Sequence, residues 1–335
     1  METGKILPEL LKKYAYKNTG VKRSEVIAHA GLGMDCSIVD FGEVVAVLST
    51  DPITAAEKNS GYLSVIISCN DVAACGANPL GILVTILLPD KASESVFKEI
   101  MESIDKAAKE LGIEVLGGHS EVTPTVTKPV ICTTALGVAK KNSFVTASHA
   151  KVGDDILVTK AIGLEGTAII AHDYEDILLK NFGREMVESA KGFLKEICVV
   201  KEGLIASASG VNAMHDITEG GLLGATYEVA QASGVGMEIY LDKVPIRQET
   251  RSICNFFNIN PLGLISSGSL LISASNGYDV ANKLRDAGID ATVIGKVIDK
   301  GIYVILPNGE KKPLTPPKRD ELYNIKEKCN KARQY

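Results

Sequence analysis

The feature that most constrains this 335-residue chain is the alternation of apolar, strand-like runs with segments of helical periodicity. Strand-like runs at residues 44–50, 81–89 and 130–139 are interleaved with helical patterns at 60–77 and 93–112. Such alternation is typical of proteins whose helices pack on β-sheets. The length predicts two domains, at about 150 residues per domain. We therefore predict an α+β protein with two domains.

A polar, turn-rich segment at residues 140–155 interrupts the pattern, and a new strand follows it. This segment predicts an N-terminal domain of residues 1–150 and a C-terminal domain of residues 151–335. Nearly consecutive strands lie between residues 291 and 306, and we expect them to pair antiparallel, which favours α+β over a doubly wound fold. The proline-rich, charged tail after residue 312 is predicted to be peripheral.

The composition disfavours several classes of function. The 36 basic and 41 acidic residues give a net charge of -5, without a basic block that could bind a nucleic-acid backbone. The N-terminal residues carry charges every few positions, so neither a secretory signal nor a membrane span is predicted. Seven scattered cysteines without a CxxC pair are typical of a reduced protein. We expect a cytoplasmic protein that binds neither nucleic acid nor membrane.

Four aspartates stand in apolar surroundings, beside glycines or at strand ends: Asp35 in GLGMDCSIVD, Asp51 in STDPI, Asp71 in CNDVAACGANP and Asp216 in MHDITEGGL. A carboxylate in such surroundings is unfavourable unless a cation or strong donors compensate it. Mg²⁺ prefers oxygen ligands and substrate phosphates. Taken singly, Asp51 is equally well explained as a turn cap, and Asp216 as the cap of a helix beginning near Thr218. Together, the four predict a magnesium site.

Asp71 is the hardest of these acids to explain structurally. Together with Asn70 it lies inside an apolar helix, where intrinsic propensity disfavours both residues. Residues that conflict with the local helix propensity are expected at functional sites. Paired glycines near the acids allow backbone amides to approach a phosphate, although none forms a standard phosphate-binding loop. These are Gly31, Gly33, Gly117, Gly118, Gly220 and Gly221.

In series, these motifs resemble the aminoimidazole ribonucleotide (AIR) synthetase superfamily, which includes thiamine-monophosphate kinase, selenophosphate synthetase and hydrogenase maturation factor E. The resemblance runs from GLGMD through STD, NDVAACGANP, GGHSEVT, GDDILVTKAIGLEGT and HDITEGGL to ISSGSLLI. It is nearest to the maturation factor E branch and the synthetase-related proteins. It implies an N-terminal α/β domain that forms a barrel with a second subunit, a C-terminal α/β domain, and ATP with Mg²⁺ held between them.

The resemblance also implies a role for each matching residue. Metal binding is implied for Asp35, Asp51, Asp71 and Asp216, and Asp71 also counts as catalytic. Nucleotide binding is implied for Gly31, Gly33, Asn70, Gly117, Gly118, Lys160, Gly220 and Gly221. Related branches carry an acid after the second glycine pair, where this sequence has His119. Because histidine ligates Mg²⁺ poorly, either Glu121 takes that catalytic place or His119 acts on a phosphate or as an acid/base.

His215 is expected to support Asp216 from behind the site. For the whole chain, the resemblance implies a homodimer that activates an acceptor oxygen with ATP, the acceptor being an unidentified small molecule or protein-borne group, and that works with a maturation partner protein. Maturation factor E ends in Pro-Arg-Ile-Cys, whose thiol carries the carbamoyl group. This chain ends in KCNKARQY, so the acceptor thiol is expected to be absent or displaced to Cys329, and the carbamoyl-dehydrating reaction is disfavoured.

Two other functions stay open. One is a small-molecule kinase of the thiamine-monophosphate kinase type, and the other is a maturation scaffold that binds a nucleotide without turning it over. The selenophosphate synthetase branch is disfavoured, because no cysteine precedes Gly31.

Overall fold

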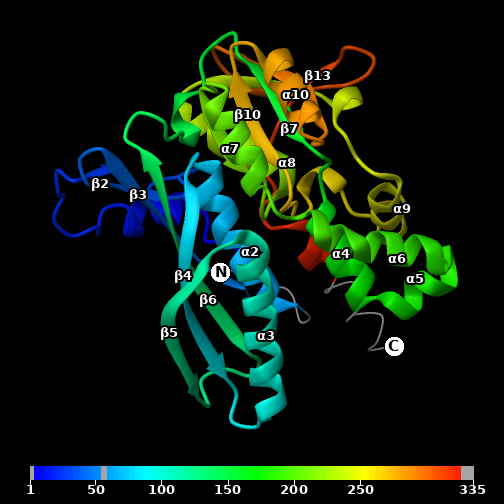
Figure 1. Cartoon of the computed structure of the whole chain (residues 1–335). Coiled ribbons are helices and arrows are strands. Elements are labelled where there is room, and N and C mark those ends of the chain that lie inside the picture. Colours follow the sequence, from blue (N-terminus) through cyan, green and yellow to red (C-terminus); the bar gives the residue numbers. More distant parts are fainter. Residues whose placement is uncertain (1–3, 54–58, 326–335) are drawn as a thin grey trace.

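A computed structural model of the chain describes residues 4–53 and 59–325. These residues form two β-sheets, each of which carries helices, in the two-domain α+β arrangement that the sequence predicts (Figure 1). The first sheet ends with strand β6 (Val130–Lys140), and the second begins with β7 (Asp155–Thr159). Among the described helices, none is both long and apolar enough to cross a membrane.

The N-terminal sheet has six strands in the order β1-β2-β3-β6-β4-β5. Neighbouring strands are antiparallel except for β4 and β5, which are parallel. Besides β6, the strands are β1 (Val26–Ala28), β2 (Ser37–Asp40), β3 (Val44–Ile53), β4 (Asn78–Leu88) and β5 (Glu114–Val122). Every second residue of β6 is buried, which indicates that one face of the sheet is covered and the other is open.

Two helices cover that buried face, α2 (Ser60–Ala74) and α3 (Glu94–Leu111). Ile82 and Ile131 of the sheet belong to one core cluster with Ile66 of α2 and Ile104 of α3. Helix α2 is buried at every position from Leu63 onwards, because the sheet, α3 and, from the other domain, α7 (Val200–Ala208) surround it. A short N-terminal α1 (Pro8–Leu10) and η1 (Leu11–Ala15) precede the sheet.

The C-terminal sheet has seven strands in the order β13-β12-β9-β11-β7-β10-β8. Besides β7, they are β8 (Ala213–Asp216), β9 (Gly236–Tyr240), β10 (Leu270–Ala274), β11 (Ala291–Ile298), β12 (Ile302–Ile305) and β13 (Lys311–Pro313). Strand β7 is buried at every position. Ile156 and Val158 pack in the core beneath α8 (Gly221–Ser233), whereas Leu157 packs in the core beneath α7 and α10 (Gly277–Asp286). Helices on both faces thus explain why this strand is apolar throughout.

Further helices complete this domain. Those on the sheet are α7 (Val200–Ala208), α8 (Gly221–Ser233) and α10 (Gly277–Asp286). A lateral cluster, seen beside the sheet in Figure 1, contains α4 (Leu164–Asp173), α5 (Glu175–Phe182), α6 (Arg184–Gly192) and α9 (Gln248–Phe257). Short 3-10 turns are η2 (Ala147–His149), η3 (Phe193–Glu196), η4 (Leu241–Lys243) and η5 (Pro261–Gly263).

The predicted antiparallel pairing between residues 291 and 306 is wrong. Strand β9 lies between β11 and β12, antiparallel to the first and parallel to the second. The chain can close around β9 because Gly236 lets the backbones approach: a Cβ there would lie 2.4 Å from the carbonyl oxygen of Gly301. The amide of Met237 donates a hydrogen bond to that same oxygen at 2.9 Å.

The predicted peripheral tail is also wrong for the residues up to 325. Leu322 and Ile325 are buried in the lateral helix cluster. Asp320 accepts hydrogen bonds from the amides of Gly220 and Leu322 at 2.7 and 2.8 Å. Burial of the apolar side chains therefore outweighs the local preference of prolines and charges for solvent. Cys329 lies outside the described residues.

Candidate functional site

A cavity of about 490 Å³ opens where the two domains meet. Its walls come from the loop before β2, from β3 and α2 of the first domain, and from β8 and α8 of the second. All four predicted metal ligands line it: Asp35, Asp51, Asp71 and Asp216. The fold therefore brings together acids from distant parts of the sequence. Their binding of a metal stays a prediction.

Each acid reaches the cavity from a different element. Asp71 projects from the last turn of α2, where Ser49 of β3 donates a hydrogen bond to its carboxylate. Asp51 lies within β3 and therefore caps no turn. Asp216 ends the edge strand β8 and does not cap α8, which begins at Gly221 without a side-chain cap.

His215 lies between two carboxylates in the cavity. Its Nδ1 is 2.5 Å from Asp35 Oδ1, and its Nε2 is 2.8 Å from Glu228 Oε2. Burial alone would lower the pKa of His215, but Asp35 and Glu228 outweigh it and raise that pKa well above its ordinary value. Both carboxylates therefore favour the protonated form of His215. Asp216 Oδ1 is farther away, at 3.8 Å, so the main partners of His215 are Asp35 and Glu228.

Lys5 supplies a second positive charge to the cavity wall. Its Nζ lies 3.4 Å from Thr218 Oγ1, and its backbone amide donates to Glu219 Oε1 at 3.0 Å. Burial would raise the pKa of Glu228, but Lys5 and then His215 lower it to about 2. Glu228 is thus a stable anion that both cations hold in place.

The remaining acids have too little positive charge around them. Burial, followed by Asp216 and Asp51, raises the pKa of Asp71 well above its ordinary value. Burial, followed by Asp35, raises the pKa of Asp216 to about 7. Asp216 Oδ2 is buried and has no hydrogen-bond partner among the described residues. Carboxylates in this situation gain most from an added cation, and an all-oxygen donor set fits Mg²⁺.

Asn70 does not line the cavity, although it precedes Asp71 and was predicted to bind the nucleotide. Its Nδ2 donates to the carbonyl of Ile197 at 2.7 Å, and its Oδ1 accepts from the amide of Val199 at 2.8 Å. Both ends of the buried amide are therefore occupied by the other domain. This explains an asparagine inside an apolar helix without any ligand.

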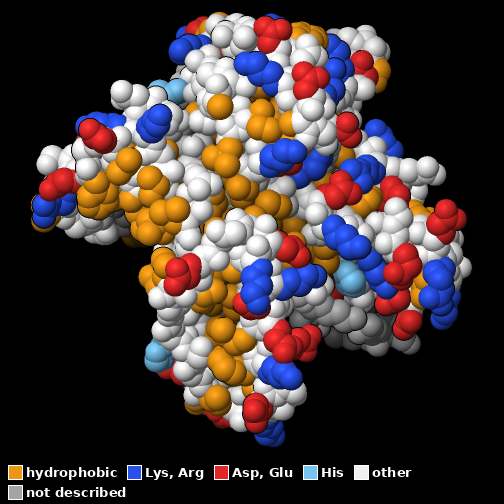
Figure 2. Space-filling view, viewed as in Figure 1, with side chains coloured by type: hydrophobic (Ala, Val, Ile, Leu, Met, Phe, Trp, Pro, Cys, Tyr) orange, Lys and Arg blue, Asp and Glu red, His pale blue; other side chains and the backbone are white. Residues whose placement is uncertain are grey.

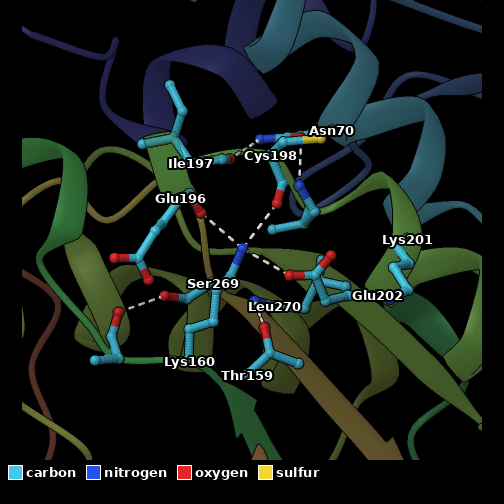
Figure 3. Close-up of polar contacts among 12 residues, drawn as sticks. Asn70, Thr159, Lys160, Glu196, Ile197, Cys198, Lys201, Glu202, Ser269 and Leu270 are labelled. Carbon is cyan, nitrogen blue, oxygen red and sulfur yellow. Dashed lines mark hydrogen bonds and ion pairs between the residues drawn. The ribbon is translucent and has the colours of Figure 1, made fainter. Parts of the chain in front are cut away.

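Lys160 binds the backbone of the same segment, residues 196–199, from the side opposite Asn70, as Figure 3 shows. Its Nζ donates to the carbonyls of Glu196 and Cys198 at 2.6 and 2.7 Å and pairs with Glu202 Oε1 at 2.6 Å. An ammonium group has three donors, and all three are used. We call Asn70, Lys160, Glu202 and the backbone of residues 196–199 the interdomain clamp. Lys160 does not line the cavity, so its position does not support the predicted nucleotide contact.

The second glycine pair is part of strand β5 at the outer edge of the N-terminal sheet, and forms no turn at the cavity. Glycine is required at position 118, because a Cβ there would lie 1.8 Å from the carbonyl oxygen of Val84 on β4. His119 and Glu121 are exposed farther along β5, with Nε2 and Oε2 3.1 Å apart. Gly117, Gly118, His119 and Glu121 therefore do not reach the cavity of their own chain.

The other predicted glycines lie closer to the acids. Gly31 and Gly33 line the cavity. Gly33 has φ +72°, and a Cβ there would lie 2.9 Å from the carbonyl oxygen of Glu228, so close packing on α8 already requires glycine. Gly220 and Gly221 directly follow the lining residues Thr218 and Glu219 at the start of α8. Contact of these glycines with a phosphate stays a prediction.

Comparison with known protein families agrees with this architecture. The family described as AIR synthase related protein matches with its N-terminal domain over residues 33–139 and with its C-terminal domain over residues 151–306. The chain belongs to the AIR synthase-related family. Among its relatives, carbamoyl dehydratase HypE of Escherichia coli is 27% identical over 285 residues, which cover 82% of this chain and 81% of that protein.

Solved structures of other proteins share the AIR synthase-related fold. The crystal structure of a HypE–HypF complex superimposes with a TM-score of 0.76 at 22% identity, covering 92% of this chain and 99% of that chain. The structure of AaThiL complexed with AMPPCP and TMP gives a TM-score of 0.73 at 22% identity, covering 93% and 97%. At these identities, the likeness establishes the two-domain fold.

Several residues that line the interdomain cavity were not identified by the sequence analysis. Lys5 and Glu228 stand in ordinary charged segments, and only the folded chain brings them to the acids. Glu165 and Ser267 also line the cavity. A signal existed for both, because the motifs GDDILVTKAIGLEGT and ISSGSLLI contain them.

Proposed function

We propose that this chain is an ATP- and Mg²⁺-dependent enzyme that transfers a phosphoryl group to an acceptor oxygen. The observation that carries the proposal is the convergence of Asp35, Asp51, Asp71 and Asp216 on one interdomain cavity with too few cations to balance them. The relative named carbamoyl dehydratase and the AIR synthase-related fold of a protein solved with AMPPCP support a nucleotide as the ligand.

In this proposal the four aspartates hold the ion, which when bound neutralises charge on the transferring phosphate oxygens. The chain's own residues do the remaining work. Lys5 binds phosphate oxygens from the cavity wall, because an ammonium forms strong charge-assisted hydrogen bonds. His215 fixes Asp35, and the Ser49 hydroxyl fixes Asp71, so that both carboxylates are oriented before the ligand arrives.

We also infer that the chain works as a homodimer. Three leucines on β4 and β5 are about half exposed: Leu80, Leu83 and Leu116, at 48, 49 and 50%. Figure 2 shows apolar side chains over the lower part of the molecule, where these strands lie in Figure 1. An uncovered apolar sheet face is typical of an interaction surface. Leu83→Glu should shift the mass measured by light scattering towards a monomer, whereas an unchanged mass would count against this surface. A maturation partner remains part of the proposal, because a similar structure is a HypE–HypF complex.

Calorimetry with ATP and Mg²⁺, followed by a phosphate-release assay, tests the enzyme proposal directly. The wild-type chain should bind the nucleotide only when the metal is present. Asp71→Asn and Asp216→Asn should lose both binding and turnover. Asp105→Asn is the matched control, because Asp105 is an exposed acid on α3.

Three outcomes separate the possible functions. Absence of heat from ATP with Mg²⁺, or unchanged binding in both aspartate variants, contradicts the proposed site. Tight binding without turnover, whatever acceptor is supplied, supports the nucleotide-binding scaffold. Turnover that rises only with a small phosphate- or hydroxyl-bearing acceptor supports the kinase.

A further inference from the structure

The cavity contains a second polar region that the proposed metal site does not use. Glu165 and Ser267 line it together with Asp320 and Glu219. After burial and the nearby Ser267, the charges that act most on Glu165 are Asp320 and Glu219, whereas those on Asp71 are Asp216, Asp51 and Asp35. Two acidic groups with different neighbours therefore share one cavity.

Glu165 and Ser267 are buried and only partly partnered, because Ser267 lies close enough to stabilise the Glu165 carboxylate but one oxygen of each side chain is left over. Their side chains are only 3 and 1% exposed, and Glu165 Oε2 and Ser267 Oγ have no hydrogen-bond partner among the described residues. Asp320 differs, because two backbone amides satisfy it. Buried polar atoms without partners are rare in folded proteins, and each calls for a ligand or water.

Hydrogen bonds join the two backbone segments that carry these side chains. Glu165 is in the first turn of α4, where the amide of Gly163 donates to Ser266 Oγ at 2.7 Å. The amide of Gly166 donates to the carbonyl of Ile265 at 3.0 Å. The start of α4 and residues 265–267 are thus tied together, which holds Glu165 and Ser267 side by side in the cavity wall.

We propose that Glu165 and Ser267 form a subsite for a cationic nitrogen group, an amine or guanidinium, on the acceptor. Glu165 Oε2 and Ser267 Oγ each accept an N–H hydrogen bond, and the acids Asp320 and Glu219 favour a positive charge over a negative one. This subsite deepens the proposed function, because it rests on a phosphoryl acceptor binding beside the nucleotide. The apolar side chains nearby, Ile265, Leu322 and Tyr323, fit the carbon body of such a molecule.

A second metal ion fits this region less well. Among the described residues, three metal-ligating atoms come within 4.8 Å of one another only at Asp35, His215 and Asp216, which belong to the first region. Glu165 belongs to no such group, and its neighbour Asp320 is already held by two backbone amides. A single carboxylate beside a hydroxyl is instead suited to one hydrogen-bonding cationic group.

Saturation-transfer NMR titrations of the full chain, without nucleotide and at pH 8, test the subsite with three probes of equal length: n-butylammonium, butyramide and butyrate. We expect n-butylammonium to bind most tightly. Glu165→Gln should weaken its binding about tenfold, since a charge-assisted hydrogen bond is lost. Ser267→Ala should weaken it about threefold. Glu238→Gln is the matched control, because Glu238 lies on β9 away from the cavity and pairs with Lys311 of β13.

Melting curves first establish that each variant folds, and Ser267→Ala carries the test if Glu165→Gln does not. Equal binding of butyrate and n-butylammonium, or unchanged binding in both variants, overturns the subsite. So does a Glu165→Gln variant that loses ATP with Mg²⁺ while keeping n-butylammonium. Failure of the metal site is distinguishable, because Asp71→Asn and Asp216→Asn would then leave ATP binding intact whatever the probes show.

Discussion

The acidic cavity and the interdomain clamp are both buried, polar and placed where the two domains meet, yet they differ in how their polar atoms are satisfied. In the clamp, Lys160 uses all three donors and Asn70 both ends of its amide. In the cavity, one oxygen each of Asp216, Glu165 and Ser267 has no partner among the described residues. A satisfied buried network stabilises a fold, whereas an unsatisfied one is stabilised by a ligand.

Breaking the clamp should have the largest effect, and on stability. Lys160→Met leaves the buried Glu202 carboxylate and two carbonyls without their cation, so the free energy of unfolding should fall by about 3–5 kcal/mol. Urea unfolding measures this change. Lys160→Met combined with Glu202→Leu is the matched control and should recover part of the loss. A fully stable Lys160→Met variant that no longer binds ATP would show that Lys160 serves the ligand and not the fold.

A substitution in the cavity should have the opposite result, with stability kept or increased and turnover lost. Asp71→Asn removes one of several buried acids that repel one another, so the melting temperature without ligand should rise. Phosphate release should nevertheless fall about 1,000-fold, or ~4 kcal/mol, because the ion loses a ligand at the reacting phosphate. Thermal unfolding and turnover are measured on the same sample. A variant that is both less stable and fully active would show that Asp71 is structural.

These two regions also show how far the sequence could be interpreted. The meeting of the four aspartates at one cavity was predictable, because an acid among apolar residues conflicts with local preference and indicates a site. Asn70 produced the same signal for a structural reason, since its partners Ile197 and Val199 lie far away in the sequence. Lys160 looked like a ligand only through its motif. Hydrogen-bond satisfaction depends on the fold, so one sequence could not separate these cases.

The same limit applies to the fold. Apolar alternation predicted strands of both sheets, such as β3, β4, β6 and β7, because burial on one or two faces leaves a local pattern. It did not predict that β9 inserts between β11 and β12, which depends on the contact between Gly236 and Gly301. The glycine pair at 117–118 was predicted to bind the nucleotide, but it lies inside the parallel strand pair of β4 and β5, where glycine is uncommon.

A pH titration should change the free energy of unfolding by about 3 kcal/mol through Glu165, one of the unsatisfied groups of the cavity. Burial raises the pKa of Glu165 from 4.5 to about 7, so the folded chain binds this proton more tightly than the unfolded chain. The free energy of unfolding without ligand should therefore fall as the pH rises from 4.5 to 7. In Glu165→Gln this part of the fall should disappear, which denaturant unfolding at several pH values measures. Equal pH dependence in both proteins would show that Glu165 has adequate partners.

The smallest effect on stability is expected on β5, far from both regions. Glu121 is exposed beside His119, and an exposed pair of this kind contributes little, so Glu121→Gln should change the free energy of unfolding by less than about 0.5 kcal/mol. The catalytic role predicted for Glu121 requires a cavity other than that of its own chain. Mixing Glu121→Gln with Asp71→Asn tests this, because a site shared between subunits would regain turnover in the mixed dimer. If Glu121→Gln alone keeps full turnover, Glu121 has no catalytic role in either subunit, and the acids of the interdomain cavity carry the reaction without β5.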